Sequence, residues 1–583
     1  MGRALAEVIT ADLAEAPGVY AIPSARLHAL DRVLGVRPIS APGISAERAQ
    51  ALAVGADGIG YGDYWIVNGR IEAHLTIMDP RTGKAVQSIG VSAAAGAVLD
   101  AANQMARRIA DRSIAYSTRQ PEAIRHYAMA LEASDAAAMI AESRLAIAAD
   151  PGFGPPYRTL AQTEAAGGDR AAAIATLDQA LARGARMPPV ERARMQFEKA
   201  SLEGDATARF QALAAMAKAS PADPELWRTY GQSAFLRHDY PPALEAFRQA
   251  IALEPDDVDS LNQMAYAAAY AGDLNEAGRL LRRYQALRPT DPNPLDSLGD
   301  AHLINGRLRE AETFYLEAAK KNPAVENGGD YFKAAVARLM TGDVAGADAL
   351  SKQFADVRSA AKDPSVDLFR AQWNWLAGRR EIAAHDAETF ARAAAHGPSR
   401  DLAALAWSQL AVWKLVMGDR SAAAQAAANA GGQAGPASAA TVSMVRLLAE
   451  PPAAAAEWTA RIERLLPRPD ESAPRDFALG YALLLDKQFD AAAPVFRRMY
   501  DSGEDSANEG LPVLLAWCYL ETGREKEAAA VIAWNPIPPV RGPSLFAPFY
   551  FPRLFALRAE AAEKTGRTNE ANANRKIFEE LAR

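Results

Sequence analysis

The chain has 583 residues, of which 50% are hydrophobic and 23% are charged, and its formal net charge at pH 7 is −7. This length exceeds what one hydrophobic core holds, so it predicts several domains or one array that grows by repetition. The acidic balance argues against nucleic acid as a partner, and the sequence has no apolar run of about 18 residues that would insert in a bilayer. We therefore expect a folded chain with no nucleic acid partner and no membrane insertion of its own.

The first 112 residues have a different residue pattern from the rest of the chain, and this pattern predicts a small α/β domain. Asn68-Gly69 is a pair that a two-residue hairpin turn prefers, because both central residues of that turn need a positive φ. The segment 79–84 predicts a second turn of the same sheet. The expected helices cover about 2–15, 24–34, 45–54 and 95–112, and the expected strands cover about 19–23, 57–67, 70–79 and 84–92.

From about residue 120 onward the sequence repeats with a period of 34 residues, seen most clearly between 224 and 323. Pro255, Pro289 and Pro323 stand 34 residues apart, and each closes a helical pattern because proline ends a helix. Before each proline come, at matching positions, a small residue, an alanine and a bulky apolar residue. These are Gly231, Ala243 and Phe247 in the first unit, Ala265, Ala277 and Leu281 in the second, and Gly299, Ala311 and Tyr315 in the third.

This pattern resembles the tetratricopeptide repeat (TPR), in which paired antiparallel helices pack through small residues and stack into a superhelix. The first unit carries the family's signature at Trp227, Tyr230, Gly231, Ala243, Phe247, Ala250 and Pro255. A glycine that opens the turn between paired helices marks the other units, at Gly168, Gly204, Gly272, Gly306, Gly342, Gly378, Gly418, Gly523 and Gly566. In one further unit Lys487 replaces this glycine. The resemblance implies a mainly α fold, a TPR superhelix (α-solenoid) of about ten or eleven units, behind the small α/β domain.

Two segments are expected to interrupt this array. Residues 428–440 are rich in Gly and Ala and predict a loose connection between two repeat blocks, and the prolines of 534–543 exclude a helix there. A polar closing helix over 569–583 would cap the array against solvent. The predicted domains are 1–115 for the α/β domain, 120–430 for a first TPR block and 440–583 for a second, more divergent TPR block with the closing helix.

The α/β domain resembles the TolB amino-terminal-like domain that precedes TPRs in many bacterial proteins. The matching segments are Leu13 to Val19, Ala49 to Asp57, Val67 to Arg70 and Ile77 to Gly83. That family opens with a central apolar strand, whereas Met1 here falls directly on the following helix. We therefore expect the first strand to be missing, from a fragment of a longer chain or from a misassigned start. In similar bacterial proteins the upstream part is a serine/threonine kinase domain with a membrane span, or a DNA-binding output domain.

No group of residues predicts a catalytic, metal or cofactor site. The histidines are scattered without the spacing of a zinc helix, and the glycines after Asp57 are not followed by the Gly-Lys-Ser/Thr of a phosphate loop. Cys518, the one cysteine, lies in an apolar run and is expected to be a buried thiol. Paired acids such as Asp256-Asp257 stand at helix starts, where the helix dipole explains them. We predict a protein that is not an enzyme and uses no metal or cofactor.

The resemblance also implies where a partner would bind. In TPR proteins the inward-facing positions of each first helix line a concave groove that holds an extended peptide. Transferred to this sequence, these positions are Glu225, Arg228, Gln232, Phe235, Asn262, Tyr266, Asn293, Asp296 and Asp300. Their amides, charges and rings would hydrogen-bond a peptide and receive its side chains. The alternative for each of them is an ordinary solvated helix face.

The sequence thus predicts a non-enzymatic protein–protein interaction scaffold of bacterial type, with a protein or peptide partner on the concave face of the repeats. The alternative is the sensor or regulatory half of a bacterial receptor serine/threonine kinase or transcription regulator whose effector domain lies upstream. The scaffold favours a cytoplasmic location. An extracytoplasmic location follows if the chain is part of a membrane receptor.

Overall fold

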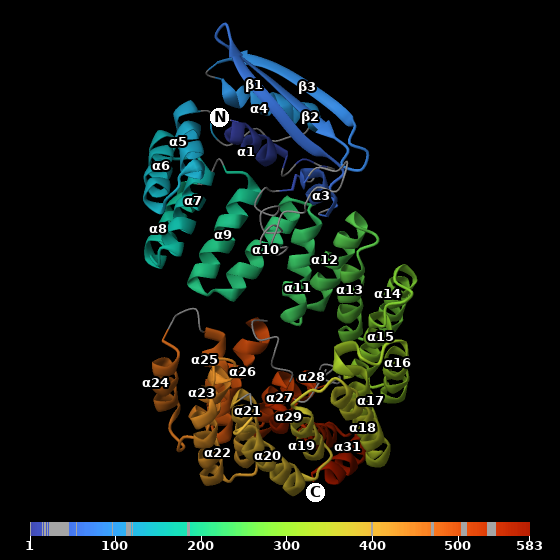
Figure 1. Cartoon of the computed structure of the whole chain (residues 1–583). Coiled ribbons are helices and arrows are strands. Elements are labelled where there is room, and N and C mark those ends of the chain that lie inside the picture. The colour runs from blue at the N-terminus through green and yellow to red at the C-terminus, as the bar shows by residue number, and fades with distance from the viewer. Residues whose placement is uncertain are drawn as a thin grey trace. The chain divides into compact units, whose positions relative to one another are not determined.

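The computed structural model describes residues 2–13, 16, 19, 21–22, 46–53, 55–95, 97–111, 118, 120–183, 187–397, 400–467, 472–502, 510–532 and 544–582. The chain divides into two compact units, Met1–Tyr230 and Gly231–Arg583. The division falls inside helix α11 (Pro224–Leu236). Figure 1 labels the helices and strands.

The first unit contains a three-stranded antiparallel sheet in the order β1-β2-β3. Its strands are β1 (Ile59–Val67), β2 (Arg70–Met78) and β3 (Ala85–Ala94). Val67 pairs with Arg70 across a two-residue turn in which Asn68 and Gly69 have φ of 49° and 73°. The predicted hairpin is therefore confirmed, because this turn needs a positive φ at both residues. The second predicted turn, at 79–84, joins β2 to β3.

Helix α4 (Val98–Ile109) packs on this sheet, and α1 (Gly2–Leu13) packs against α4 (Figure 1). Alternate residues of a strand point to the same face, so the apolar residues of β2 and β3 meet the helices together. The resulting core includes Val8, Ile71, Ala73, Ile89, Val91, Leu99 and Met105. The sheet and these two helices make up the predicted small α/β domain.

The other elements predicted for this domain are only partly described. The helix predicted over 45–54 is present as α3 (Ala46–Ala53). Val19, Ala21 and Ile22 belong to no strand, and the rest of the strand predicted over 19–23 lies outside the described residues. The helix predicted over 24–34 also lies outside them.

Helical pairs follow the sheet in the first unit. They are α5 (Pro121–Glu132) with α6 (Ala136–Ala149), α7 (Gly154–Ala166) with α8 (Arg170–Arg183), and α9 (Pro189–Glu203) with α10 (Ala206–Ala219). Helices α6 and α10 begin at Asp135 and Asp205, whose carboxylates accept backbone N–H groups of the first turn. Such caps satisfy donors that have no partner inside the helix.

The second unit continues the array in pairs, beginning with α11 and α12 (Tyr240–Leu253). The following pairs are α13 (Val258–Tyr270) and α14 (Leu274–Leu287), α15 (Asn293–Ile304) and α16 (Leu308–Lys321), α17 (Gly329–Leu339) and α18 (Val344–Ala360), α19 (Val366–Leu376) and α20 (Arg380–Ala394), and α21 (Arg400–Val416) and α22 (Arg420–Gln433). The last pairs are α23 (Ala439–Leu448) and α24 (Ala455–Leu465), α25 (Ser472–Leu485) and α26 (Phe489–Ser502), α27 (Leu511–Glu521) and α28 (Glu525–Val531), and α30 (Arg553–Lys564) and α31 (Thr568–Leu581). The short helices η2 (Val325–Asn327) and α29 (Ala547–Tyr550) lie between pairs. The pairs of the two units together outnumber the ten or eleven units that the sequence predicts.

The glycines predicted to open the turns between paired helices all have a positive φ, between 70° and 87°. Glycine adopts this left-handed backbone without the steric cost that a side chain adds. The next residue often caps the second helix, as Asp273, Asp343 and Asp419 do by accepting a backbone N–H. Lys487, in the unit without the glycine, takes the same region with φ of 56°. The predicted turn positions are therefore confirmed.

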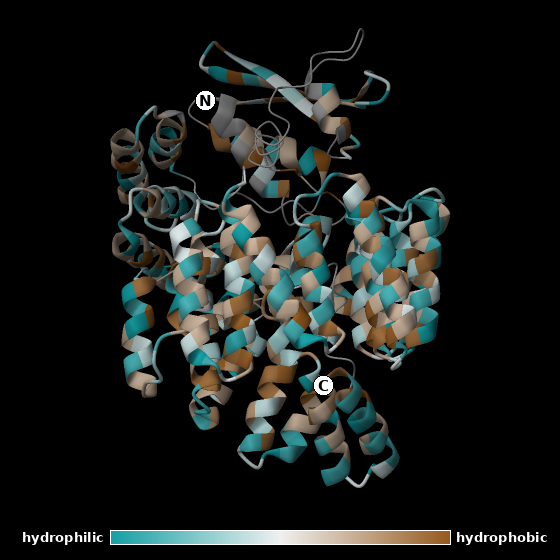
Figure 2. Cartoon of the chain, turned by 60° about the horizontal axis from the view of Figure 1, so that its bottom comes forward, coloured by the Kyte–Doolittle hydropathy of each residue, from teal (hydrophilic) through white to brown (hydrophobic). Residues whose placement is uncertain are grey.

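Small residues let the paired helices approach closely. Ala243, Ala277 and Ala311 are fully buried, and a Cβ atom added at Gly299 would stand 2.5 Å from ring carbons of Tyr315. Along the helices, hydrophobic and hydrophilic residues alternate (Figure 2), because one stripe of each helix packs on its neighbours. The fold is therefore mainly α, a series of helical pairs preceded by a small α/β domain, as the sequence predicts.

One predicted interruption of the array is wrong. Residues 428–440 were expected to form a loose connection, yet α22 continues to Gln433 and α23 begins at Ala439. Ala430 is fully buried, so packing outweighs the helix-weakening effect of the glycines that follow it. The remaining segment, 434–438, is tied to α21 by Asp401, whose carboxylate accepts N–H groups of the segment at 3.0 and 3.1 Å. The second predicted interruption, 534–543, lies outside the described residues, whereas the closing helix is present as α31.

Within the second unit, segments far apart in the sequence also meet. The ring of His238, in the turn after α11, stacks on Tyr500 of α26 with 4.2 Å between centroids. Burial lowers the pKa of His238 to about 4, so the stacked ring is neutral at neutral pH. The main-chain oxygen of Leu581 lies close to Gly378, since a Cβ added there would stand 2.9 Å from it. The second unit is therefore more than a string of neighbouring pairs.

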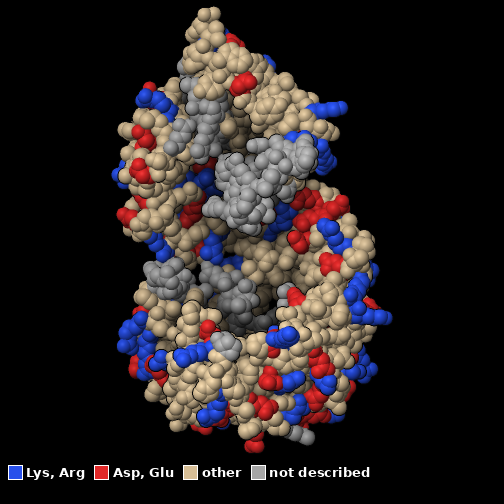
Figure 3. Space-filling model, viewed as in Figure 1, with Lys and Arg blue, Asp and Glu red and all other residues tan. Residues whose placement is uncertain are grey.

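None of the described helices is long and apolar enough to cross a membrane. On the face in Figure 3, Lys and Arg are interspersed with Asp and Glu. That mixture gives the visible surface no extended field of one sign.

Candidate functional site

The first two predicted groove residues form an ion pair on the surface of α11. Arg228 Nε donates to Glu225 Oε2 at 3.0 Å, and a second guanidinium nitrogen of Arg228 lies 2.9 Å from the same oxygen. The two residues are one helical turn apart, so the pair forms within a single helix. Arg228 therefore already has an anionic partner.

The next predicted residues are partly buried. Gln232 is half-buried, and the ring of Phe235 packs edge-on against Tyr270 at 5.6 Å and against Tyr240 at 6.0 Å. Asn262 Oδ1 is buried and has no hydrogen-bond partner among the described residues. Phe235 thus supports packing between successive repeats, which is a structural role.

Asn293 serves the loop before α15. Its side-chain amide donates to the hydroxyl of Tyr284 at 3.2 Å, and its backbone N–H donates to Asp291 at 2.9 Å. Tyr284 in turn donates to Asp291 at 2.8 Å. These three residues form a small hydrogen-bonded group that fixes the start of the helix.

The structure brings Tyr266, Asp296 and Asp300 together around Lys333, which the sequence analysis did not single out. Lys333 Nζ lies 2.6 and 2.8 Å from the carboxylate oxygens of Asp296, and 3.1 and 3.2 Å from those of Asp300. The hydroxyls of Tyr266 and Tyr315 donate to Asp300 at 2.5 and 2.8 Å. We call these five residues the Lys333 cluster. It joins α13, α15, α16 and α17, three successive repeats.

Burial controls the charges of the Lys333 cluster. Burial by itself disfavours a charged lysine, but Asp300 and Asp296 outweigh it and raise the pKa of Lys333 above its usual value. Burial, with the Asp296 carboxylate beside it, raises the pKa of the adjacent Asp330 to about 8. Asp330 Oδ2 has no hydrogen-bond partner among the described residues. Every carboxylate oxygen of Asp296 and Asp300 lies within hydrogen-bond distance of Lys333 Nζ. This buried ion pair therefore holds the helices together and is not an open binding surface.

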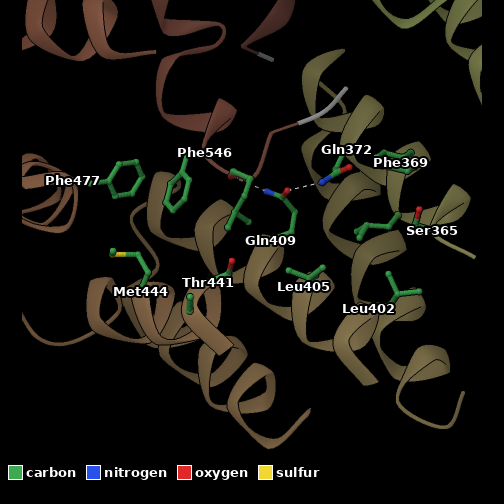
Figure 4. Close-up of a pocket in the computed structure, with 13 residues that line it drawn as sticks. Ser365, Phe369, Gln372, Leu402, Leu405, Gln409, Thr441, Met444, Phe477 and Phe546 are labelled. Atoms are coloured by element: carbon green, nitrogen blue, oxygen red, sulfur yellow. Dashed lines mark hydrogen bonds between the residues drawn. The ribbon is translucent and has the colours of Figure 1, made fainter. Parts of the chain in front are cut away.

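A separate apolar pocket of about 560 Å³ opens on the first helices of later repeats in the second unit (Figure 4). A cavity of this size falls in the range of small-ligand sites. Its walls come from α19, α21, α23 and α25 and from a short segment before α29. The lining residues are Ser365, Leu368, Phe369, Gln372, Leu402, Leu405, Gln409, Ala440, Thr441, Met444, Phe477, Leu545 and Phe546. None of these side chains carries a charge.

Glutamines on the first helices of two successive repeats build one wall of this pocket. Gln372 and Gln409 stand 37 residues apart, and Gln372 Nε2 donates to Gln409 Oε1 at 2.8 Å. Gln409 Nε2 donates onward to the main-chain oxygen of Leu545 at 3.2 Å. We call residues 544–546 the strap. Gln372 Oε1 is buried and has no hydrogen-bond partner among the described residues.

The sequence contained a signal for this pocket that the groove assignment did not use. Gln372 stands six residues before the turn glycine Gly378, as Asp300 stands before Gly306. The groove positions were assigned only up to residue 300. The same spacing from the turn glycine, applied to this later repeat, selects Gln372. No such signal existed for Leu545, which is not on a regular repeat position.

The described residues offer little chemistry outside these sites. They contain no group of His, Cys, Asp and Glu side chains arranged to hold a metal ion. Burial raises the pKa of the Cys518 thiol to about 12, so the thiol stays protonated and is a poor nucleophile at neutral pH.

No family model matches the sequence, and no curated protein matches it either. Among solved structures, YrrB, described as a TPR protein with an unusual peptide-binding site, is 16% identical, with a TM-score of 0.27, over 31% of this chain and 92% of its own. MamA from Desulfovibrio magneticus RS-1 is 16% identical, with a TM-score of 0.25, over 30% of this chain and 97% of its own. PilW, a type IV pilus biogenesis factor, is 18% identical, with a TM-score of 0.25, over 34% and 90%.

Proposed function

We propose that the chain is a non-enzymatic scaffold that binds a protein or peptide on the inner face of its helical repeats. The observation that carries this proposal is the apolar pocket on the first helices of the second unit. Its lining includes Leu402, Leu405, Met444 and Phe546, all of which keep part of their surface accessible. Apolar side chains that converge on a recess with a few polar groups are typical of binding sites.

The two sets of inner-face residues would have different roles in this scaffold. The Lys333 cluster holds three repeats in one arrangement, whereas the pocket leaves apolar side chains partly accessible and contains one amide oxygen without a partner among the described residues. Rigid repeats that present an open recess reduce the ordering that binding requires. The predicted groove around Glu225 and Arg228 remains part of the proposal as a second, more polar contact. The predicted regulatory role for an upstream effector domain has no observation of its own in its favour.

The test is a selection from a library of displayed random peptides on the immobilised full chain. Leu405→Arg places a charge in the pocket, where no lining residue can pair with it. Ile382→Arg is the matched control, because Ile382 lies on α20, outside the lining set, and is 52% exposed. The wild-type chain and Ile382→Arg should enrich the same peptides, and Leu405→Arg should lose them. Equal enrichment by all three chains would contradict the proposed binding face.

A further inference from the structure

The second unit already holds a segment of its own against this inner face. Gln409 donates a hydrogen bond to the backbone oxygen of Leu545 in the strap. The ring of Phe546 packs edge-on against Phe477 at 5.0 Å and lies tilted against Tyr481 at 5.1 Å. The face therefore holds the strap in two ways, through a glutamine amide on the backbone and through apolar walls for side chains (Figure 4).

Gln372 lies on the first helix of the preceding repeat, beside Gln409, and only the nitrogen of its side-chain amide is hydrogen-bonded. Its Nε2 is engaged with Gln409, and its Oε1 is buried without a partner in the described part of the chain. A buried acceptor that stays unpaired loses the hydrogen bond it had with water. A ligand that brings an N–H group to Gln372 Oε1 would restore that bond.

We propose that the pocket takes an extended, uncharged segment of a partner protein beside the strap. A backbone N–H of this segment donates to Gln372 Oε1, and a side chain the size of leucine or methionine enters the cavity near Leu405 and Met444. The inference rests on the proposed function and names the chemistry of its ligand. The strap remains in place as one wall, because Gln409 holds its backbone.

The lining selects among ligands of similar size. A charged side chain would lose its hydration without gaining a partner, because all lining side chains are neutral. An acyl chain would fill the same volume but would leave Gln372 Oε1 unpaired, since it has no donor. An extended peptide supplies both an apolar side chain for the cavity and a nearby backbone N–H that can donate to Gln372 Oε1.

The experiment uses the full chain with ¹³C-labelled methionine methyl groups, and Met444→Leu identifies the signal of Met444. The probes are the capped peptide Ac-Ser-Ala-Ala-Leu-Ala-Ala-Ser-NH2, its variant with central Asp, and three variants with one N-methyl group at each of the three central residues. The leucine peptide should shift the Met444 signal in a saturable manner, and the Asp peptide should not. One N-methyl variant should bind about three- to tenfold more weakly, the effect of one neutral hydrogen bond. Gln372→Leu should abolish that difference, as in a double-mutant cycle.

Other outcomes overturn the inference. If the leucine peptide binds by calorimetry but leaves the Met444 signal unmoved, the scaffold function survives and the pocket ligand is wrong. If dodecanoate moves the signal and no peptide does, the pocket serves an acyl chain. If neither these probes nor any library peptide binds the chain, both proposals fail. Where Gln372→Leu does not fold, the N-methyl series on the wild-type chain decides alone: equal binding of all variants contradicts the hydrogen bond.

Discussion

Replacing Lys333 by methionine tests whether the Lys333 cluster holds three repeats together. The lysine side chain is 2% exposed and the Asp300 side chain 4%, and four nitrogen–oxygen distances of 2.6 to 3.2 Å join Lys333 to its two aspartates. Methionine has a similar volume, so little cavity forms, but two buried carboxylates lose their counter-charge. Removing one partner of a buried ion pair destabilises a protein by about 3–5 kcal/mol, because the remaining charge is unpaired and dehydrated.

Hydrogen exchange is the suitable assay, because a repeat chain of two units does not unfold in a single step. Exchange reports the free energy of local opening in α15 and α17, where the cluster lies. The expected loss corresponds to protection that falls about 100-fold to several thousand-fold, since about 1.4 kcal/mol is a tenfold change. Lys352→Met is the matched control: Lys352 pairs with Asp356 on the surface, and the two side chains are 76% and 54% exposed. An exposed pair of this kind contributes about 0–1 kcal/mol.

The result that would refute this reasoning is equal protection of α15 and α17 in the two variants. The cluster would then add no net stability over an apolar residue of the same size. Lys333→Met combined with Asp300→Asn provides a second check. The double variant should be less unstable than the sum of the single changes, because the unpaired carboxylate is removed together with its partner.

Three further predictions concern other parts of the second unit. Gly231→Arg should unfold the central repeats, seen as lost protection there, because even a Cβ at Gly231 would stand 3.0 Å from the ring of Phe247. The raised pKa of Asp330, about 8, means that the folded state holds a proton that the unfolded state releases above about pH 4. The protonated Asp330 should therefore contribute stability to α17 that is lost as pH rises from about 4 to 8, and Asp330→Asn should remove this contribution to the opening free energy of α17 measured by hydrogen exchange. Gln409→Leu should speed exchange in α29 about five- to tenfold, because Leu545 loses its hydrogen bond; unchanged exchange would mean the strap is held by packing alone.

The repeat architecture could be predicted in detail because the local backbone preferences of the residues and their packing favour the same structure. The 34-residue spacing, the turn glycines and the buried alanines each have one structural use, and all are found where the sequence places them. The prediction for residues 428–440 was wrong because the local backbone preferences and the packing favour different structures there. Gly431 and Gly432 suggested a loose connection, but the burial of Ala430 and its neighbours keeps α22 helical to Gln433.

The sites could be predicted only in part, because they depend on contacts between repeats. Asp296 and Asp300 were predicted as groove residues, but nothing in the sequence of either repeat alone shows that Lys333 lies between them. A lysine inside the apolar run of α17 was the available signal. The strap could not be foreseen, because Leu545 reaches Gln409 across 136 residues. The resemblance of the first domain to a TolB amino-terminal-like domain stays a prediction.

Site-specific cross-linking tests the binding face most directly. The photoreactive residue p-benzoylphenylalanine would replace Thr441, a half-buried lining residue of α23, and, in a second chain, Ile382 on α20. Each full chain would be irradiated with a peptide enriched by the wild-type chain, and the linked product identified by mass spectrometry. The account predicts a cross-link from position 441 that excess unlabelled peptide removes, and none from position 382. A cross-link from position 382 alone, or from neither position with a peptide that binds, would contradict the claim that the inner face of the repeats is the binding surface.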